Sequence, residues 1–353
     1  MTRFIARNMR RWLLPFASLL CCSMSLAAPP LPALSAQVQG ITVSGISSGA
    51  YMAVQYQVAR SKSVSGVGAI AGGPYECAAG STWTALTRCM SPNDWWAPVP
   101  GVQELQAHIE RRAAAGLIDS PEDLRDDRVW VFSGDEDKTV ARAVVDSLVA
   151  TYARWVPPAS LRYVKLPGAG HAMVSVAAAQ ANACATTEPP YINRCGDFDT
   201  AGQLLEFLLG PLATRQSPPQ GQLHEFDQAV AMGGKPADIG LADTGYVFVP
   251  SACVGGGCKV HVAFHGCRQS SAQVGKAFVE GAGYNEWAAG NHLIVLYPQT
   301  VPRYGWGAGS SRWVFNPRAC WDWWGYTDPA YATRDGLQIK AVQAMVEALG
   351  RHP

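Results

Sequence analysis

Several patterns that would assign a function are missing from this chain. After residue 27 no apolar run is long enough to span a bilayer, so we expect no membrane-embedded segment there. No tract of lysines and arginines follows either, and subtracting the four arginines of residues 1–27 lowers the formal charge from +1 to −3. A mildly acidic chain without a basic tract is not expected to bind nucleic acid or anionic lipid. There is also no internal repeat.

Residues 1–27 have the composition of a secretion signal. They contain four arginines and no acidic residue, then an apolar run over residues 12–20, and they end in Ser25-Leu26-Ala27, which meets the small–x–small rule for signal cleavage. The Arg10-Arg11 pair matches a twin-arginine signal less well than the segment matches the general secretory route. We therefore expect a mature chain that starts at Ala28 and is exported, either to the periplasm or out of the cell.

Cysteine usage agrees with export. Eight cysteines follow the predicted cleavage site, and an even number in an exported chain favours disulfides. Three pairs close in sequence suggest themselves, which leaves a long-range fourth: Cys77 with Cys89, Cys184 with Cys195, Cys253 with Cys258, and Cys267 with Cys320. The fourth bridge is expected to contribute about 2–4 kcal/mol of stability. No Cys-x-x-Cys pair is present, so we expect no metal site.

A candidate nucleophile lies in Gly45-Ile46-Ser47-Ser48-Gly49. This Gly-x-Ser-x-Gly string is weak evidence alone, because glycine and serine cluster in ordinary turns. Here it follows a β-like run over residues 38–43 and precedes an apolar, helix-like stretch over residues 51–58. That strand–turn–helix setting is what a sharply bent, exposed serine requires, so Ser47 is the predicted nucleophile.

The partners of such a serine follow in the order acid, then histidine, in an α/β-hydrolase. Residues 128–132 are typical of a buried strand, and a loop rich in carboxylates follows them. Asp137 is our choice for the acid because it lies just before Lys-Thr-Val, where we expect a helix to start. Asp135 and Glu136 remain alternatives, or are solvated loop charges.

The candidate base follows the next strand-like run, over residues 161–166. His171 closes Pro-Gly-Ala-Gly-His, where the surrounding glycines leave its ring accessible. His171 is therefore predicted to take the proton of Ser47, while the acid orients the ring and stabilises the imidazolium.

The donors for an oxyanion suggest a rearranged chain. The amide of Ser48, directly after the nucleophile, is the first expected donor. The second candidate lies far downstream, where the strand-like run 259–264 ends in His265-Gly266-Cys267. Such hydrolases place this turn before the nucleophile, and another apolar strand, residues 293–297, follows it here. The inverted order predicts a circularly permuted α/β-hydrolase fold, with His265 as a structural turn residue.

Taken together, these motifs resemble the single-domain poly(3-hydroxybutyrate) depolymerases, secreted or periplasmic serine esterases with a circularly permuted α/β-hydrolase fold. The resemblance covers nearly all of the chain after residue 27. It rests on Ser-Gly-Ile-Ser-Ser-Gly-Ala-Tyr-Met-Ala at 44–53, Gly-x-x-Asp-x-Thr-Val at 134–140, Gly-His at 170–171, His-Gly-Cys at 265–267 and Cys-Trp-Asp-Trp-Trp-Gly-Tyr at 320–326.

The resemblance implies roles for individual residues. It implies that Ser47, Asp137 and His171 form the catalytic triad, and that the amides of Ser48 and Cys267 form the oxyanion hole. It also implies that one tryptophan of the 321–324 cluster lines the polyester site. Trp324 is the first choice, and Trp323 and Trp321 are close alternatives.

The chain is expected to form one catalytic domain over residues 28–353. Residues 74–127 are interpreted as a lid-like insertion that borders the site, and residues 211–222, polar and rich in proline, as the connection between the permuted halves. No separate substrate-binding domain is expected, so polymer adsorption would use exposed tryptophans of the catalytic domain. Trp130 and Trp287 are instead expected in the core.

The predicted function is hydrolysis of backbone esters of poly(3-hydroxybutyrate) or related short-chain polyhydroxyalkanoates through an acyl-enzyme. No cofactor is needed, and a monomer is expected. An alternative keeps the same fold and changes the substrate to oxidised polyvinyl alcohol, feruloyl esters or short oligomers. A further alternative, disfavoured by the intact serine, acid and histidine, is a non-catalytic polymer-binding protein.

Overall fold

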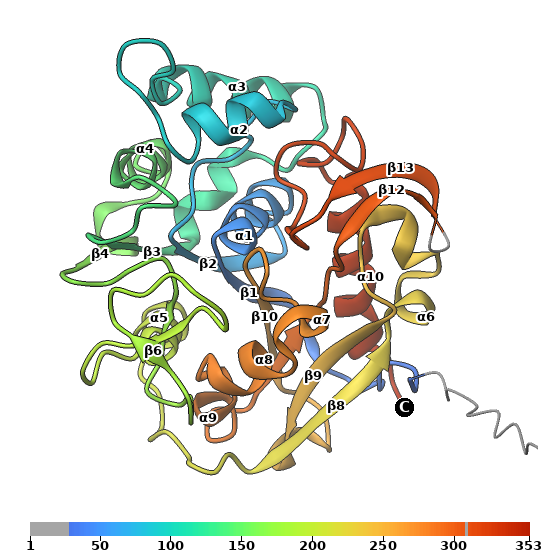
Figure 1. Ribbon diagram of the computed structural model, residues 1–353. Coiled ribbons are helices and arrows are strands. Elements are labelled where there is room, and N and C mark those ends of the chain that lie inside the picture. Colours follow the sequence, from blue (N-terminus) through green and yellow to red (C-terminus); the bar gives the residue numbers. More distant parts are fainter. Residues whose placement is uncertain (1–27, 308–309) are drawn as a thin grey trace, which may run out of the picture.

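The computed structural model describes residues 28–307 and 310–353, so the predicted signal peptide, residues 1–27, lies outside the described residues. Its centre is an eight-stranded sheet in the order β4-β3-β2-β1-β10-β11-β9-β8 (Figure 1). The strands are β4 (Leu161–Leu166), β3 (Arg128–Gly134), β2 (Val64–Ile70), β1 (Gln37–Ile46), β10 (Lys259–Phe264), β11 (Leu293–Tyr297), β9 (Thr244–Pro250) and β8 (Gly221–Asp227). The strands from β4 to β11 in this order are parallel, whereas β9 and β8 pair antiparallel.

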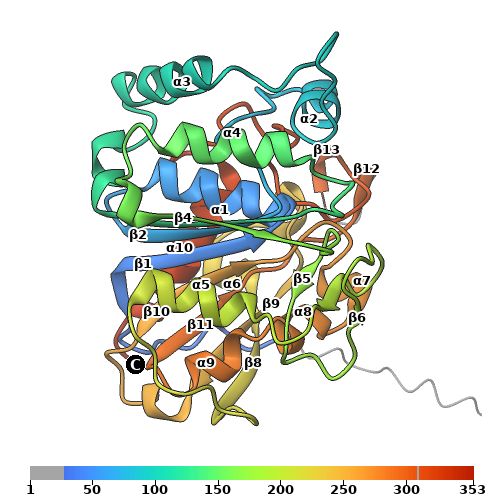
Figure 2. The ribbon, with the colours of Figure 1, turned by 90° about the vertical axis from the view of Figure 1, so that its left-hand side faces the viewer.

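Helices cover both faces of this sheet, as Figure 2 shows for α1 and α4 on one side and α5 and α9 on the other. The first face packs against α1 (Ser48–Ala59), α4 (Arg142–Tyr152) and α10 (Leu337–Gly350). The second face packs against α5 (Thr200–Leu209), α8 (Ala277–Gly281) and α9 (Tyr284–Ala288). A parallel sheet covered on both faces needs strands that are apolar throughout, and the five residues of β11 are accordingly all buried.

The remaining elements lie outside the central sheet and the helices named above. The helices are α2 (Thr82–Arg88), α3 (Val102–Ala114), α6 (Gln228–Met232) and α7 (Ser271–Val274), with 3₁₀ turns at Pro121–Asp126, Pro158–Ser160, Pro236–Ile239 and Ser251–Cys253. Two small sheets combine β5 (Met173–Val174), β7 (Ile192–Arg194) and β6 (Asn182–Ala183), and β12 (Arg303–Gly307) with β13 (Ser310–Asn316). Of the helices that the structure describes, none combines the length and apolarity that a bilayer crossing demands.

The strand order confirms the circularly permuted α/β-hydrolase fold. Strands β1 to β4 form one half of the sheet and β8 to β11 form the other, and the halves meet where β1 pairs with β10. The strand that ends in the His-Gly-Cys turn is therefore the direct neighbour of the strand that ends in Ser47, although it follows more than 200 residues later in the sequence. Near the two ends of the described chain, the amides of Leu34 and Ala36 both donate to the carbonyl of Leu349.

The strand predictions agree with the structure and one helix prediction does not. Strands β4, β10 and β11 have the predicted bounds. Helix α4 begins at Arg142, whereas we expected a helix to begin at Lys-Thr-Val after Asp137. The amides of Thr139 and Val140 donate to the Asp137 side chain instead, so this segment forms a turn that closes on the carboxylate.

The predicted insertion and connection occupy definite places. Residues 74–127 contain α2, α3 and a 3₁₀ turn, and Figure 1 shows α2 and α3 above α1. Residues 211–220 carry neither helix nor strand, and β8 already starts at Gly221, so the last two residues of the predicted connection belong to this strand.

Candidate active site

Ser47 sits at the sharp turn between β1 and α1. Its backbone has φ 55° and ψ −122°, a region that residues other than glycine seldom occupy and that marks a strained, functional turn. The flanking glycines make this turn possible. A Cβ on Gly45 would lie 2.2 Å from the carbonyl oxygen of Gly49, and a Cβ on Gly49 would lie 2.3 Å from that of Phe264 on the neighbouring strand.

Asp137 and His171 form a buried pair at the ends of two neighbouring strands. Asp137 follows β3, His171 follows β4, and His171 Nδ1 lies 2.7 Å from Asp137 Oδ2. The two side chains are 2% and 8% exposed. The other carboxylate oxygen, Oδ1, accepts from the amides of Thr139 at 2.8 Å and Val140 at 2.9 Å. The carboxylate is therefore held in one orientation and leaves Nε2 as the ring nitrogen free to exchange a proton.

The two competing acids point elsewhere. Asp135 accepts from the amide of Gly168, and Glu136 pairs on the surface with Lys138 at 3.5 Å. Of the three carboxylates that the sequence left open, the structure brings only Asp137 to His171.

A cavity of about 170 Å³ joins these groups. Ser47, His171, Gly266 and Cys267 all line it. Ser48 is the first residue of α1, so its amide has no acceptor inside the helix. Among the described residues, the amides of Ser48 and Cys267 have no hydrogen-bond acceptor. Two unpaired amides near a nucleophilic serine can donate hydrogen bonds to the oxyanion of a tetrahedral intermediate.

The Cys267 turn is built by side chains from distant segments. Gln269 Oε1 accepts from the amide of Gly266, and its Nε2 donates to the carbonyls of Pro190 and Tyr191. His265 is fully buried, and burial lowers its pKa to about 4, so it is neutral and accepts from the amide of Thr300. His265 therefore braces the turn, as expected of a structural residue.

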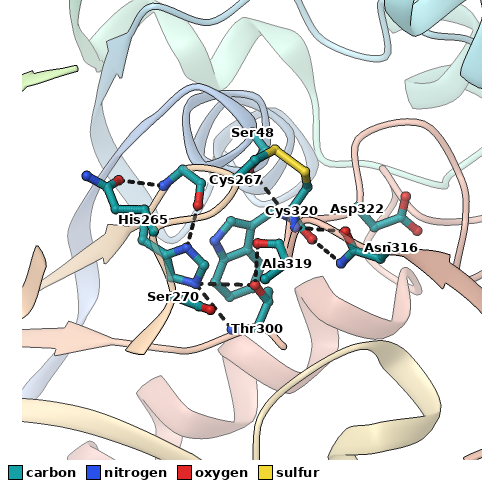
Figure 3. The surroundings of a disulfide bond; sticks show 12 residues. Ser48, His265, Cys267, Ser270, Thr300, Asn316, Ala319, Cys320 and Asp322 are labelled. Carbon is teal, nitrogen blue, oxygen red and sulfur yellow. Dashed lines mark hydrogen bonds between the residues drawn. A yellow bond between two sulfur atoms is a disulfide. The ribbon is translucent and has the colours of Figure 1, made fainter. Parts of the chain in front are cut away.

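All four expected disulfides are present: Cys77–Cys89, Cys184–Cys195, Cys253–Cys258 and Cys267–Cys320. Figure 3 shows the last, which joins the turn after β10 to the segment that carries the tryptophan cluster. Asn316 holds the second cysteine, since its Nδ2 donates to the carbonyl of Cys320 and its Oδ1 accepts from the amide of Cys320. The backbone amide of Trp321 in turn donates to Ser48 Oγ at 3.3 Å.

The three tryptophans of the cluster lie in different environments. Trp324 and Trp323 line a second cavity of about 250 Å³, which shares Met90, Cys267 and Arg318 with the first. Trp323 is 4% exposed and stacks on Tyr51 at 4.1 Å, whereas Trp324 is half-buried. Trp321 has no exposed surface, packs edge-on against Phe264 and lines neither cavity. The structure therefore places Trp321 in the core, where its ring also packs against His265, rather than at the polyester site that the sequence predicted.

Asp322 sets the shape of this segment. Its Oδ1 accepts from the amides of Trp324, Gly325 and Tyr326, and its Oδ2 accepts from that of Thr327 at 2.8 Å. Burial nevertheless raises the pKa of Asp322 to about 6. The loop that presents Trp324 is thus wrapped around one buried carboxyl group.

Several residues of the cavity escaped the sequence analysis. Met90, Thr139, Thr187, Tyr191, Arg268, Gln269 and Arg318 also line it. Met90 is the one residue of the predicted insertion, residues 74–127, among them. Most of these positions are identified only by contacts between segments that are distant in the sequence. The exception is Arg268 and Arg318, because the predicted Cys267–Cys320 pair placed each within two residues of a shared bridge.

Known proteins resemble this chain closely. No family model matches it. A poly(3-hydroxybutyrate) depolymerase of Delftia acidovorans is 39% identical over 91% of the chain, which spans 62% of that protein's length. A polyhydroxybutyrate depolymerase of Talaromyces funiculosus is 33% identical over 92% of the chain and 93% of its own length.

Solved structures agree. A PHB depolymerase from Penicillium funiculosum is 32% identical and superposes with a TM-score of 0.80, and a PHB depolymerase with a serine-to-alanine substitution, complexed with R3HB trimer, has a TM-score of 0.81. Each comparison covers 92% of this chain and 100% of the solved chain. With this identity and coverage, the chain belongs to the family of poly(3-hydroxybutyrate) depolymerases.

Proposed function

We propose that this protein is a serine esterase that hydrolyses backbone ester bonds of poly(3-hydroxybutyrate) or related short-chain polyhydroxyalkanoates, releasing oligomers and monomers. The observation that carries the proposal is the buried Asp137–His171 pair, 2.7 Å apart, beside a strained Ser47 in one cavity. A relative in this family, named a depolymerase, has been solved in complex with R3HB trimer, which supports a polyester substrate.

The reaction has two steps. Ser47 Oγ attacks the ester carbonyl and gives its proton to His171 Nε2, while the amides of Ser48 and Cys267 hold the negative oxygen of the tetrahedral intermediate. His171 then protonates the departing hydroxyl, which leaves an acyl group on Ser47. Water repeats the sequence with His171 as base and frees the acid. Asp137 keeps the proton of the ring on Nδ1 throughout.

Exposed aromatic side chains supply an adsorption surface for an insoluble polymer. Tyr304, Trp306, Trp313 and Phe315 alternate with buried residues on β12 and β13, so that all four lie on one face; they are 74%, 68%, 53% and 47% exposed. We call these four residues the aromatic hairpin. Phe315 also lines the second cavity, so the hairpin leads from open surface to Trp324. Exposed apolar patches of this kind usually mark binding sites.

A second exposed group lies on the insertion. The ring centroids of Trp83 and Trp96 are 6.0 Å apart, Trp95 is 95% exposed, and Leu86 of α2 lines the same cavity as Phe315. Both groups therefore offer apolar surface to a polymer. Trp130, by contrast, is buried in the core as expected. Trp287 is half-buried and packs against the same core cluster.

The wider organisation belongs to the same proposal. Residues 28–353 act as one catalytic domain, with residues 74–127 as a border of the site and residues 211–222 as the connection between permuted halves. Four disulfides support an exported protein, to the periplasm or the outside of the cell, after removal of residues 1–27. The protein acts as a monomer.

The alternative substrates are oxidised polyvinyl alcohol, feruloyl esters and other short esters. A comparison of kcat/KM on a soluble 3-hydroxybutyrate trimer, a feruloyl ester and oxidised polyvinyl alcohol separates them. We expect the trimer to be the best substrate, and a higher kcat/KM on either other ester would overturn the polyester assignment. Labelling with an organophosphate tests the non-catalytic alternative, since a protein that only binds polymer would leave Ser47 unmodified.

A further inference from the structure

The catalytic cavity carries two positive charges that ester hydrolysis does not require. Arg268 and Arg318 both line it, and no acidic residue does. Arg318 also lines the second cavity, again without an acidic neighbour in the lining. Both side chains are exposed, and within residues 28–307 and 310–353 neither pairs with a carboxylate.

The backbone around these arginines is held rigidly beside the predicted oxyanion hole. Arg268 directly follows Cys267, and Arg318 lies two residues before Cys320, so the disulfide cross-links the two segments. The amide of Arg268 donates to the carbonyl of Arg318 at 2.6 Å, and Arg268 takes a left-handed φ of 60°. The two arginine side chains therefore extend from fixed backbone next to Ser47. We call these two residues the arginine rim (Arg268 and Arg318).

The charge of the rim contrasts with that of the chain. Without residues 1–27 the formal charge is −3, yet the linings of the two joined cavities contain only cationic side chains as full charges. A neutral polyester segment gains little from a guanidinium, because an ester carbonyl is a weak acceptor. A carboxylate gains much more, since the planar guanidinium matches its two oxygens and the hydrogen bonds are charge-assisted.

A hydroxyalkanoate oligomer has one anionic group, the carboxylate at its end. When Ser47 takes the acyl carbon of an ester, every atom beyond the ester oxygen leaves with the alcohol. The terminal carboxylate is always on that departing fragment. Arg318 lines both the cavity of Ser47 and the cavity of Trp324, so its side chain is placed to reach the carboxylate of a short departing fragment.

We propose that the arginine rim binds the terminal carboxylate of short hydroxyalkanoate oligomers, so that the enzyme prefers free-acid oligomers to neutral esters of the same length. This inference rests on the proposed function and adds to it a specificity for chain ends. It makes the protein an enzyme that completes the degradation of soluble oligomers as well as one that attacks polymer.

The test compares two substrates that differ in one charge: 3-hydroxybutyrate trimer as the free acid and as its methyl ester. We expect kcat/KM for the acid to exceed that for the ester by about tenfold at low ionic strength, through KM. Arg318→Gln and Arg268→Gln should each lower this ratio toward 1, and added salt should lower it in the unmutated protein. Arg351→Gln removes the same charge near the C-terminus and should leave the ratio as it is.

The ratio within each protein cancels any effect on the chemistry that both substrates share, including a partial loss of folding. Equal kcat/KM for acid and ester in the unmutated protein would overturn the arginine rim while leaving the esterase intact. A loss of activity on both substrates by the same factor in the two variants would leave the acid-to-ester ratio unchanged and would overturn the role of the arginines in binding the carboxylate. An unmutated protein that hydrolyses neither substrate would contradict the proposed function itself.

Discussion

At the scale of single residues, the orientation of Asp137 matters more than its charge alone. One carboxylate oxygen is occupied by the amides of Thr139 and Val140, so only the other can face His171. In Asp137→Asn the amides would keep the side-chain oxygen, and the NH₂ group would face Nδ1. The ring would then carry its proton on Nε2 and could not accept one from Ser47.

We therefore expect Asp137→Asn to lower kcat on a soluble ester by about 10⁴-fold with little change in unfolding free energy. Glu136→Gln is the matched control, because Glu136 lies one residue away and pairs only with Lys138 on the surface. If the Asp137→Asn protein retained more than a tenth of the activity, measured by initial rates, another acid would have to orient His171.

Asp127 gives the fold an unusual dependence on pH. Burial raises its pKa to about 7, although Gln57 Nε2 donates to its Oδ2 at 2.7 Å. The unfolded chain loses this proton near pH 4, so between about pH 4 and pH 7 the folded state binds more protons than the unfolded state. The contribution of Asp127 to stability therefore falls as the pH rises through this window.

Asp127→Asn should remove that slope. The unfolding free energy of the variant minus that of the unmutated protein should increase by a few kcal/mol from about pH 4 to about pH 7.5. This increase corresponds to the shift in the pKa of Asp127. Urea unfolding at the two pH values measures the difference, with Glu122→Gln, an exposed carboxylate in the 3₁₀ turn that precedes Asp127, as control. An equal difference between the two proteins at both pH values would contradict a raised pKa.

At the scale of elements, the turns after β1 and β10 depend on each other. The disulfide between Cys267 and Cys320 spans 53 residues and fixes the turn that carries the Cys267 amide. Replacing both cysteines by serine should lower the unfolding free energy by about 2–4 kcal/mol. It should also lower kcat by about tenfold or more, since a small displacement of an oxyanion donor is costly.

Cys253→Ser with Cys258→Ser is the control for that pair. This bridge closes only 5 residues and lies at the opposite ends of the strands from Ser47, so kcat should not change. Chemical unfolding and initial rates on a soluble ester give both quantities. If the Cys267/Cys320 variant retained full kcat, the disulfide would stabilise the fold without positioning the site.

Sequence patterns predicted the elements of this fold because most signals are local. The bounds of β4, β10 and β11 follow from strand-like runs bordered by turns. The Gly-x-Ser-x-Gly string was recognisable because Gly45 approaches Gly49 too closely for a side chain. The predicted start of α4 was wrong because Ala141 is extended and its amide donates to the carbonyl of Met90, so the helix begins only at Arg142. Trp321 was misplaced because its ring packs against Phe264 and His265, which lie more than 50 residues away in the sequence. The arginine rim escaped notice because its residues meet only through the disulfide.

At the scale of the whole molecule, exposed aromatic side chains offer a surface for contact with the polymer. The aromatic hairpin and the tryptophans of the insertion expose their rings, and Phe315 of the hairpin and Leu86 of the insertion line the same cavity as Trp324. We expect Trp306→Ala with Trp313→Ala to lower the rate on solid polymer about tenfold more than the rate on a soluble ester, because two large apolar contacts are lost.

Val254→Ala serves as control, since Val254 is 71% exposed but remote from the hairpin. Binding of the protein to polymer granules, measured from its depletion in solution, should fall in the double tryptophan variant and not in the control. If both proteins adsorbed as the unmutated protein does, polymer contact would lie elsewhere on the surface.

The central claim is that Ser47 attacks the ester bonds of a polyhydroxyalkanoate, and one experiment tests it most directly. Clearing of an amorphous poly(3-hydroxybutyrate) suspension is followed by turbidity, and released 3-hydroxybutyrate and oligomers are quantified, for the protein from Ala28 onward and for its Ser47→Ala variant. We predict that the unmutated protein clears the suspension and that Ser47→Ala slows clearing by several orders of magnitude. Clearing at similar rates by both proteins, or by neither, would contradict the account.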